Sequence, residues 1–175
     1  NRAYEDAMLE LRDLAIAVGF TPIAAAAFIG EHSFTTEAAP IAQGRPDSTD
    51  LQYAQAFGHE IHLKLQTLKN LPEHSPVEVP GNYPYKERRQ RATIVAPVTR
   101  DDNCTLCGTC ATACPVHAIT VDTHVTTLGS ACILCCACVK QCPTQVRVME
   151  HPRIKKITQW LYTNCSKRQE PETYL

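Results

Sequence analysis

Eight cysteines in the second half of this 175-residue chain follow one spacing pattern that occurs twice. The pattern is Cys-x2-Cys-x2-Cys-x3-Cys-Pro, and it begins at Cys104 and again 28 residues later at Cys132. Three thiolates at every third residue can surround one face of a cubane cluster, with short turns that direct N–H groups at sulfur. The fourth cysteine precedes a helix-stopping proline and points toward the neighbouring cluster. The spacing therefore predicts two [4Fe–4S] clusters, and with them a role in electron transfer.

The predicted coordination is crossed, because each cluster takes three cysteines from one copy and the fourth from the other. The expected ligands of cluster 1 are Cys104, Cys107, Cys110 and Cys142. The expected ligands of cluster 2 are Cys132, Cys135, Cys138 and Cys114. Small and apolar residues near these ligands would keep water from the sulfides, and they are Ala111, Ala113, Pro115, Ala131, Ile133, Val139 and Pro143. Shared ligands would hold both clusters in one rigid domain.

Zinc and disulfide bonds explain this pattern less well. Structural zinc is usually held by two separated Cys-x2-4-Cys pairs, which need neither a third cysteine at +6 nor a fourth at +10 before proline. A disulfide framework is typical of exported proteins. The amphipathic, charged residues 1–20 lack the uninterrupted apolar segment of an export signal. We therefore favour two cubane clusters over either alternative.

The remaining cysteines and the histidines have simpler interpretations. Cys136 stands between two expected ligands, and we interpret it as a small buried spacer, with a ninth ligand as the alternative. Cys165 is expected on the apolar face of a helix. His59 and His62 lie three residues apart on a predicted helix, where a solvated pair is favoured over a metal site because no acidic partner is nearby. No nucleophile–base arrangement is visible in the sequence.

Residues 1–70 contain no cysteine and predict helix, strand, loop and helix. Apolar residues recur at helical spacing over 4–18, and Gly19 ends that helix. The apolar run 22–29 predicts a buried strand in a sheet covered on both faces. Asp47 is a plausible N-cap for a second helix, whose expected apolar face is Leu51, Ala54, Gly58, Ile61, Leu65 and Leu68.

Residues 71–97 contain five prolines and a basic run at 86–91, and they predict a solvated, partly extended linker. The alternative is that its arginines lie against the cluster domain and orient it. Residues 98–150 form the predicted cluster domain, with short strands at 117–121 and 146–148 and an approximate internal two-fold axis. Residues 151–175 predict a helix and tail, with Trp160 either packing against a neighbouring element or shielding a cofactor.

The formal net charge is −1, and two clusters that each carry about −2 with their thiolates would bring the chain to roughly −5. This charge favours redox partner proteins with basic surfaces and argues against nucleic acid. No apolar run reaches the length of a membrane span. Ten cysteines without an export signal favour a reducing, oxygen-poor compartment, and we expect a cytoplasmic location.

The segments DDNCTLCGTCATACP and CILCCACVKQCP resemble bacterial-type two-cluster ferredoxins. The flanking segments NRAYEDAMLELRDLA, AAAFIGEHSF, PIAQGRPD and NCSKRQEPE are similar to the flavodoxin–ferredoxin fusion proteins of anaerobes. The resemblance implies an α+β fold, with a partial flavodoxin-like α/β segment, then a ferredoxin-like domain with internal pseudo-two-fold symmetry, then a C-terminal helix.

The resemblance also implies a flavin-facing rim formed by Asn1, Arg2, Gly30, Glu31 and His32. The Gly/Ser/Thr-rich loop that holds the FMN phosphate in that family has no counterpart in this sequence. We therefore do not expect this polypeptide alone to bind FMN tightly. It is then either a fragment of a longer protein or a module that has lost its flavin.

Three functions are compatible with these observations. The favoured one is a non-enzymatic carrier that passes single electrons between a low-potential donor and a flavin or flavoprotein. The second is a flavin-dependent reductase whose clusters supply electrons to FMN. The third is a redox sensor in which cluster loss rearranges the chain and releases a partner.

Overall fold

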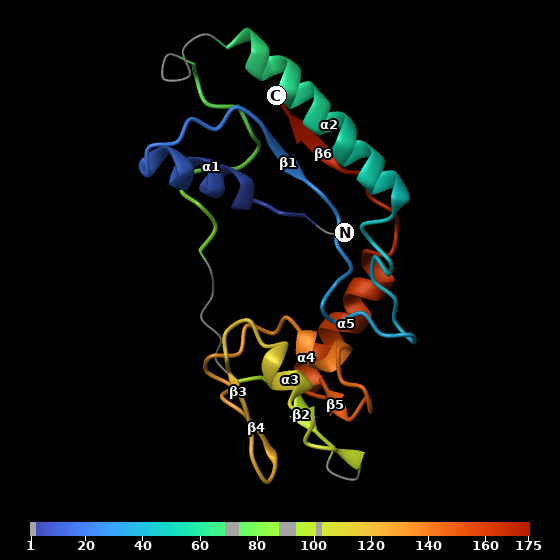
Figure 1. Cartoon of the computed structure of the whole chain (residues 1–175). Coiled ribbons are helices and arrows are strands. Elements are labelled where there is room, and N and C mark those ends of the chain that lie inside the picture. The colour runs from blue at the N-terminus through green and yellow to red at the C-terminus, as the bar shows by residue number, and fades with distance from the viewer. Residues whose placement is uncertain (1–2, 69–73, 88–93, 101–102) are drawn as a thin grey trace. The chain divides into compact units, whose positions relative to one another are not determined.

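The computed structural model describes residues 3–68, 74–87, 94–100 and 103–175, which form helices and small two-stranded sheets (Figure 1). The chain divides into two compact units. Unit 1 comprises Asn1–Glu31, Ala42–Arg89 and Lys167–Leu175, and unit 2 comprises His32–Ile41 and Gln90–Ser166. Each unit is therefore assembled from segments that are far apart in the sequence.

Unit 1 contains two helices, α1 (Ala7–Ala17) and α2 (Ser48–Thr67). The predicted N-cap of α2 is confirmed, because the Asp47 carboxylate accepts hydrogen bonds from the backbone N–H groups of Thr49 and Asp50. The predicted apolar face of α2 is wrong: Leu51 is 61% exposed, whereas Asp50 and Phe57 are buried. Asp50 is buried because it forms an ion pair with the side chain of Arg45.

The sheet of unit 1 joins two strands that are far apart in the sequence. Strand β1 (Ala25–Ala27) pairs antiparallel with β6 (Glu172–Tyr174), as the blue and red arrows in Figure 1 show. Strand β1 is half-buried, and within the described residues this sheet has two strands and no parallel pairing. A doubly wound flavodoxin-like sheet is parallel, so the flavodoxin-like segment is not confirmed. The sequence pattern did not predict β6.

The described part of the Pro-rich segment before the cysteines is hydrogen-bonded to α1 and to its N-cap residue. The Asp6 carboxylate accepts hydrogen bonds from the backbone N–H groups of Asn82 and Lys86, at 2.8 Å each. The Tyr85 hydroxyl donates to Asp13 at 2.7 Å. The arginines of the basic run lie outside the described residues, so their predicted orientation against the cluster domain stays a prediction.

Unit 2 contains the cysteine motifs and two small antiparallel sheets. Strand β2 (Val98–Thr99) pairs with β5 (Arg147–Val148), and β3 (Ile119–Val121) pairs with β4 (Val125–Thr127). The strands that the sequence predicted after each motif are thus confirmed with shorter bounds. Two short helices, α3 (Thr109–Thr112) and α4 (Ala137–Lys140), each carry the third cysteine of a copy.

Helix α5 (Pro152–Asn164) follows the motifs and packs within unit 2. Its buried face contains Leu161, with Ile157 partly buried beside it, and it contacts Ile41 and Cys165. The apolar face expected from the sequence, formed by Ile154, Ile157, Leu161 and Cys165, is confirmed as buried or partly buried, although its contact with Ile41 was not foreseen. Trp160 is 52% exposed. Within the described ranges, no helix has the length and apolar character that a membrane span requires.

The two cysteine copies repeat in backbone conformation as well as in sequence. Three pairs of residues separated by 28 positions have positive φ angles, namely Leu106 and Leu134, Gly108 and Cys136, and His117 and Gln145. The sheet registers repeat in the same way, because adding 28 to one strand and subtracting 28 from its partner converts the Thr99–Arg147 pair into the Thr127–Ile119 pair. The strands after the motifs therefore pair crosswise, each with the strand before the other copy. The predicted two-fold axis itself stays a prediction.

Candidate metal centre

A left-handed residue precedes the third cysteine in each copy. Gly108 (φ 77°) is the N-cap of α3, and Cys136 (φ 56°) is the N-cap of α4. The chain turns sharply at these residues and then begins a helix of one turn that carries Cys110 or Cys138. Both cysteines are buried, at 7% and 6% exposed. The local conformation thus places one thiol of each copy in the interior of unit 2.

Cysteines from both copies line one enclosed cavity. Cys114 of the first copy and Cys132, Cys135 and Cys138 of the second copy all contribute to its wall. The other lining residues are mostly apolar, and they are Pro97, Val116, Ala118, Ile119, Thr127, Ile133 and Cys136. These four motif cysteines are the set that the crossed spacing assigns to cluster 2.

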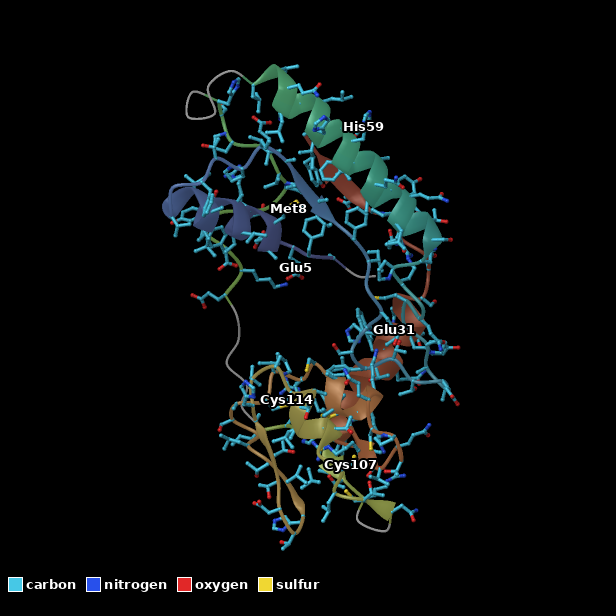
Figure 2. All side chains as sticks on the ribbon, viewed as in Figure 1. Glu5, Met8, Glu31, His59, Cys107 and Cys114 are labelled. Atoms are coloured by element: carbon cyan, nitrogen blue, oxygen red, sulfur yellow. The ribbon has the colours of Figure 1, made fainter. Side chains whose placement is uncertain are left out.

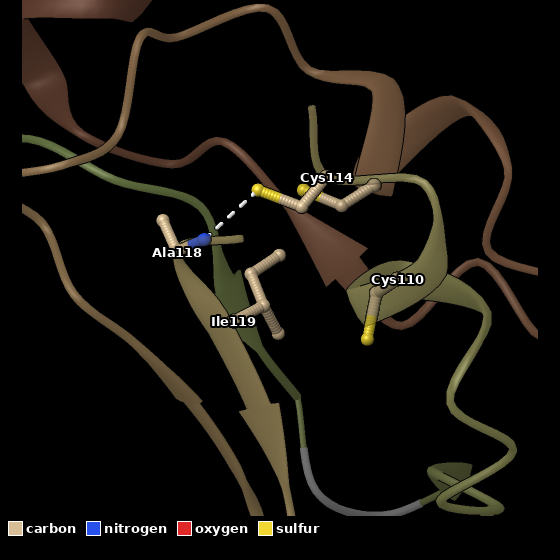
Figure 3. Packing of buried hydrophobic residues seen from close by; sticks show 5 residues of the cluster. Cys110, Cys114, Ala118 and Ile119 are labelled. Carbon is tan, nitrogen blue, oxygen red and sulfur yellow. Dashed lines mark hydrogen bonds between the residues drawn. The ribbon is translucent and has the colours of Figure 1, made fainter. Parts of the chain in front are cut away.

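The four cysteines that the crossed spacing assigns to cluster 1 differ in exposure. Cys107 is exposed, Cys104 and Cys142 are intermediate, and Cys110 is buried. In Figure 3 the sulfurs of Cys110 and Cys114 point in different directions, as the crossed assignment requires of ligands to different clusters. Figure 2 labels Cys107 and Cys114 in their place in unit 2.

All ten cysteines are described, and none of them forms a disulfide bond. Among the described residues, no group of three or more His, Cys, Asp or Glu side chains converges closely enough to hold a single metal ion. The ligands of a [4Fe–4S] cluster are four thiolates around a body of eight atoms, so they do not converge on one point.

Backbone N–H groups are directed at the fourth cysteine of each copy. The N–H of Ala118 donates to the Cys114 sulfur at 3.2 Å, which Figure 3 marks with a dashed line. In the second copy, burial acts to raise the pKa of Cys142, but backbone N–H groups of Arg147, Val146 and Thr144 outweigh burial and lower it. Hydrogen bonds of this kind stabilise a thiolate, which is the form that binds iron.

Hydroxyl groups lie close to the sulfurs of Cys107 and Cys142. The Thr109 hydroxyl lies 3.3 Å from the Cys107 sulfur, and hydrogen bonding from Thr109 lowers the pKa of this exposed thiol. The Thr144 hydroxyl lies 3.7 Å from the Cys142 sulfur. Threonine stands two residues after the ligand in both places, so sequence inspection could have identified these contacts.

Arg147 is a member of this site that the sequence analysis did not identify. Its side chain lies in β5 and is 2% exposed. It donates to the hydroxyls of Thr99 and Thr127 and contacts the Cys138 sulfur at 3.8 Å. Burial raises the pKa of Cys138, and Arg147 acts in the opposite direction. The only indication in the sequence is a charged residue between two valines of a predicted strand.

Cys136 is buried, at 3% exposed, as predicted for a spacer. Burial raises the pKa of its thiol to about 12, and the sulfurs of Cys138 and Cys135 add to the effect. Its interpretation as a spacer and not a ninth ligand stays a prediction, which rests on two ligand sets that are complete without it. Cys165 lies in a separate apolar cluster with Ile41 and Leu161.

The predicted flavin rim stays a prediction, because not all of its residues are described and they are divided between the two units. Asn1 and Arg2 lie outside the described residues, Gly30 and Glu31 belong to unit 1, and His32 belongs to unit 2. Gly30 lines a cavity in unit 1 together with Tyr4, Phe28 and Tyr174. The described lining of this cavity includes Glu5, Glu170 and Glu172 and contains no lysine or arginine. These residues do not fit the phosphate of FMN, because like charges would repel.

The two helix α2 histidines lie on an exposed stretch of the chain. His59 is exposed and is labelled in Figure 2. His62 lies 3.0 Å from the Gln66 side chain, measured from ring nitrogen to amide nitrogen. This contact agrees with the interpretation of a solvated pair.

Residues 97–120 match the family model of the 4Fe-4S binding domain. The matched segment contains the first cysteine copy together with β2, α3 and the start of β3. No curated protein and no solved structure matches the chain. The match indicates that a ferredoxin-type domain is present and that the chain binds a 4Fe–4S cluster.

Proposed function

We propose that this chain is an electron-transfer protein that carries two [4Fe–4S] clusters with crossed ligands. The observation that carries the proposal is the enclosed cavity lined by Cys114 together with Cys132, Cys135 and Cys138. These four thiols come from both copies, in the three-plus-one combination that crossed coordination requires. Cluster 1 is assigned to Cys104, Cys107, Cys110 and Cys142 by the 28-residue repeat of sequence and backbone.

The residues around these cysteines fit a bound cluster. The motif thiols form no disulfides and include buried members in both copies. N–H donors face the sulfurs of Cys114 and Cys142. The buried guanidinium of Arg147 has no hydrogen-bond partner for its Nε among the described residues. An anionic group beside this cation would compensate its burial.

When bound, each cluster would supply a centre that accepts and releases one electron. The chain's own residues hold and insulate these centres. Ala118 and Ile119 are buried apolar residues in the wall of the cavity, where they would limit the access of water to the sulfurs. Cys114 and Cys142, as ligands shared across the copies, tie the two halves into one body. The crosswise strand pairing supports the proposal that the halves are related by an approximate two-fold axis within 98–150.

The electron partners are proposed from charge. The formal charge of −1 and about −2 for each loaded cluster give roughly −5. We expect a partner with a basic docking surface, such as a flavoprotein acceptor, because complementary charge steers association. A reducing cytoplasmic location would protect the exposed thiol of Cys107 from oxidation.

The proposal is tested by anaerobic reconstitution with iron and sulfide, followed by desalting and analysis of iron, sulfide and zinc per chain. We expect about eight iron and eight sulfide. Dithionite should reduce the product, and a flavoprotein acceptor should reoxidise it. Stoichiometric zinc without sulfide, or about four iron per chain, would contradict the proposal of two clusters.

Flavin binding is tested separately with the same preparation. FMN is added, the protein is desalted and acid-extracted, and the released flavin is measured by fluorescence. The acidic lining of the cavity beside Gly30 predicts no retained flavin. Stoichiometric FMN would instead favour the flavin-dependent reductase.

A further inference from the structure

Unit 1 and unit 2 each contain a buried arginine, and the two differ in their partners. Arg45 is 9% exposed and forms an ion pair with the buried carboxylate of Asp50. Arg147 is 2% exposed, and no ion pair joins it to a carboxylate within the described ranges. A buried cation without a counter-charge is strongly destabilising. Among the described residues, Arg147 therefore has no carboxylate partner of the kind that Asp50 provides for Arg45.

Neutral groups take up most of the hydrogen bonds from Arg147. Nη1 donates to the Thr99 hydroxyl at 2.8 Å, and Nη2 donates to the Thr127 hydroxyl at 2.9 Å. These hydroxyls satisfy N–H groups but do not balance the charge. The Cys138 sulfur, which can become anionic, lies 3.8 Å from Nη2. The missing counter-charge thus points to the thiolate of Cys138 and the cluster that it would bind.

The first copy places no charge at the corresponding position. Residue 119 precedes residue 147 by 28 positions, and it is a buried isoleucine in the same strand register. Ile119 packs against Cys110, Cys114 and Cys138 in the core of unit 2. The backbones of the two copies correspond at this position. The copies therefore differ here in side-chain charge and not in backbone geometry.

We infer that Arg147 selectively raises the reduction potential of the cluster bound through Cys138. This inference rests on the proposed function. The step is the transfer of one electron from an external low-potential donor, with no bond formed or broken and no proton taken up. The cluster with its thiolates changes from about −2 to −3, and a neighbouring buried cation stabilises the more negative state. Arg147 makes the two copies electrically unequal.

The experiment compares variants by anaerobic redox titration monitored by EPR. Arg147→Gln removes the charge and keeps N–H donors, Arg147→Lys keeps the charge, and Arg100→Gln is the matched control. Arg100 belongs to the same unit, but its side chain is 62% exposed and forms an ion pair with Glu150. Iron and sulfide content establish that each variant is loaded before its potentials are measured.

We expect Arg147→Gln to shift one of the two couples to lower potential. The expected change is at least tenfold in the one-electron equilibrium constant, which corresponds to about 59 mV. The other couple and the Arg100→Gln protein should move by less than a third of that amount. Arg147→Lys should retain most of the wild-type potential. Unmoved couples, an equal shift of both, or an Arg147→Lys shift as large as that of Arg147→Gln would overturn the inference.

A second measurement uses only the wild-type protein, so it does not depend on the folding of a variant. Wild-type protein containing arginine labelled with 15N only in its guanidinium group is reduced and studied by pulsed EPR, which detects nitrogen nuclei close to the unpaired electron. We expect 15N modulation on the signal of one cluster, and its absence from both signals would overturn the inference. Wild-type protein without two clusters would refute the proposed function instead, so the two failures are distinguishable.

Discussion

The two cysteine copies have the same backbone but different interiors. Both turn through a left-handed residue before a one-turn helix, and their strands pair in equivalent registers. Ile119 fills the interior in the first copy, whereas Arg147 occupies the equivalent position in the second. Backbone geometry is therefore fixed by cysteine spacing and turns, while the side chains at equivalent positions are able to distinguish the two sites electrically.

The copies also differ in the solvent exposure of their cysteines and in the residue at the left-handed turn. The enclosed cavity contains the three leading cysteines of the second copy, whereas Cys107 of the first copy is exposed. The first copy uses Gly108 at its left-handed turn, and the second uses Cys136. Glycine adopts this conformation without steric cost, whereas cysteine does not. The burial of Cys136 offsets this strain.

The largest expected effect comes from replacing the fourth cysteine of each copy by serine. Cys114→Ser should remove cluster 2 and Cys142→Ser should remove cluster 1, so each variant falls from about eight to about four iron. EPR of the reduced variants should show two different remaining signals. Cys165→Ser is the control, because this buried cysteine packs in the cluster around Ile41. Cys110→Ser identifies the signal that remains without cluster 1, so crossed ligands predict that Cys142→Ser leaves this same signal. If Cys114→Ser leaves it instead, the ligands are not crossed.

A smaller effect is expected from truncating the first-copy counterpart of Arg147. Ile119 is 7% exposed and packs against three motif cysteines. Ile119→Ala should lower the free energy of unfolding by about 3 kcal/mol, because it leaves a cavity. Anaerobic denaturant titration followed by cluster absorbance measures this change. An unchanged free energy of unfolding would contradict the packing of Ile119 against these cysteines.

The smallest effect concerns the left-handed turns. At Gly108 an added Cβ would meet no atom within 4 Å, so Gly108→Ala tests backbone conformation alone. It should lower the free energy of unfolding by about 1 kcal/mol. Cys136→Gly should change stability little, because relief of strain and loss of buried surface oppose each other. Equal losses for both variants would indicate that Cys136 contributes mainly through packing.

Local patterns in the sequence predicted several features of unit 2 and one helix cap of unit 1. The cysteine spacing identified the motif, and the segments after each copy formed the expected strands β3 and β5. Asp47 capped α2 as predicted. These features succeed because a cap, a turn or a ligand spacing depends on residues a few positions apart.

Features that depend on distant residues were not predictable. Strand β6 has three residues, and its partner β1 lies more than 140 positions earlier. The burial of Arg147 depends on Thr99 and Thr127, which β-pairing brings to it. Leucines of α2 are exposed although their spacing suggested a buried face. Periodicity indicates which residues can share a helix face, but tertiary packing decides whether that face is covered.

The central claim is that the chain holds two neighbouring [4Fe–4S] clusters, and spin counting of the fully reduced wild-type protein tests it most directly. Quantitative EPR of dithionite-reduced, reconstituted protein should give two spins per chain, broadened by interaction between neighbouring centres. One spin per chain with an unbroadened signal, from protein whose iron is fully accounted for, would contradict the claim and leave the second cysteine copy without its assigned cluster.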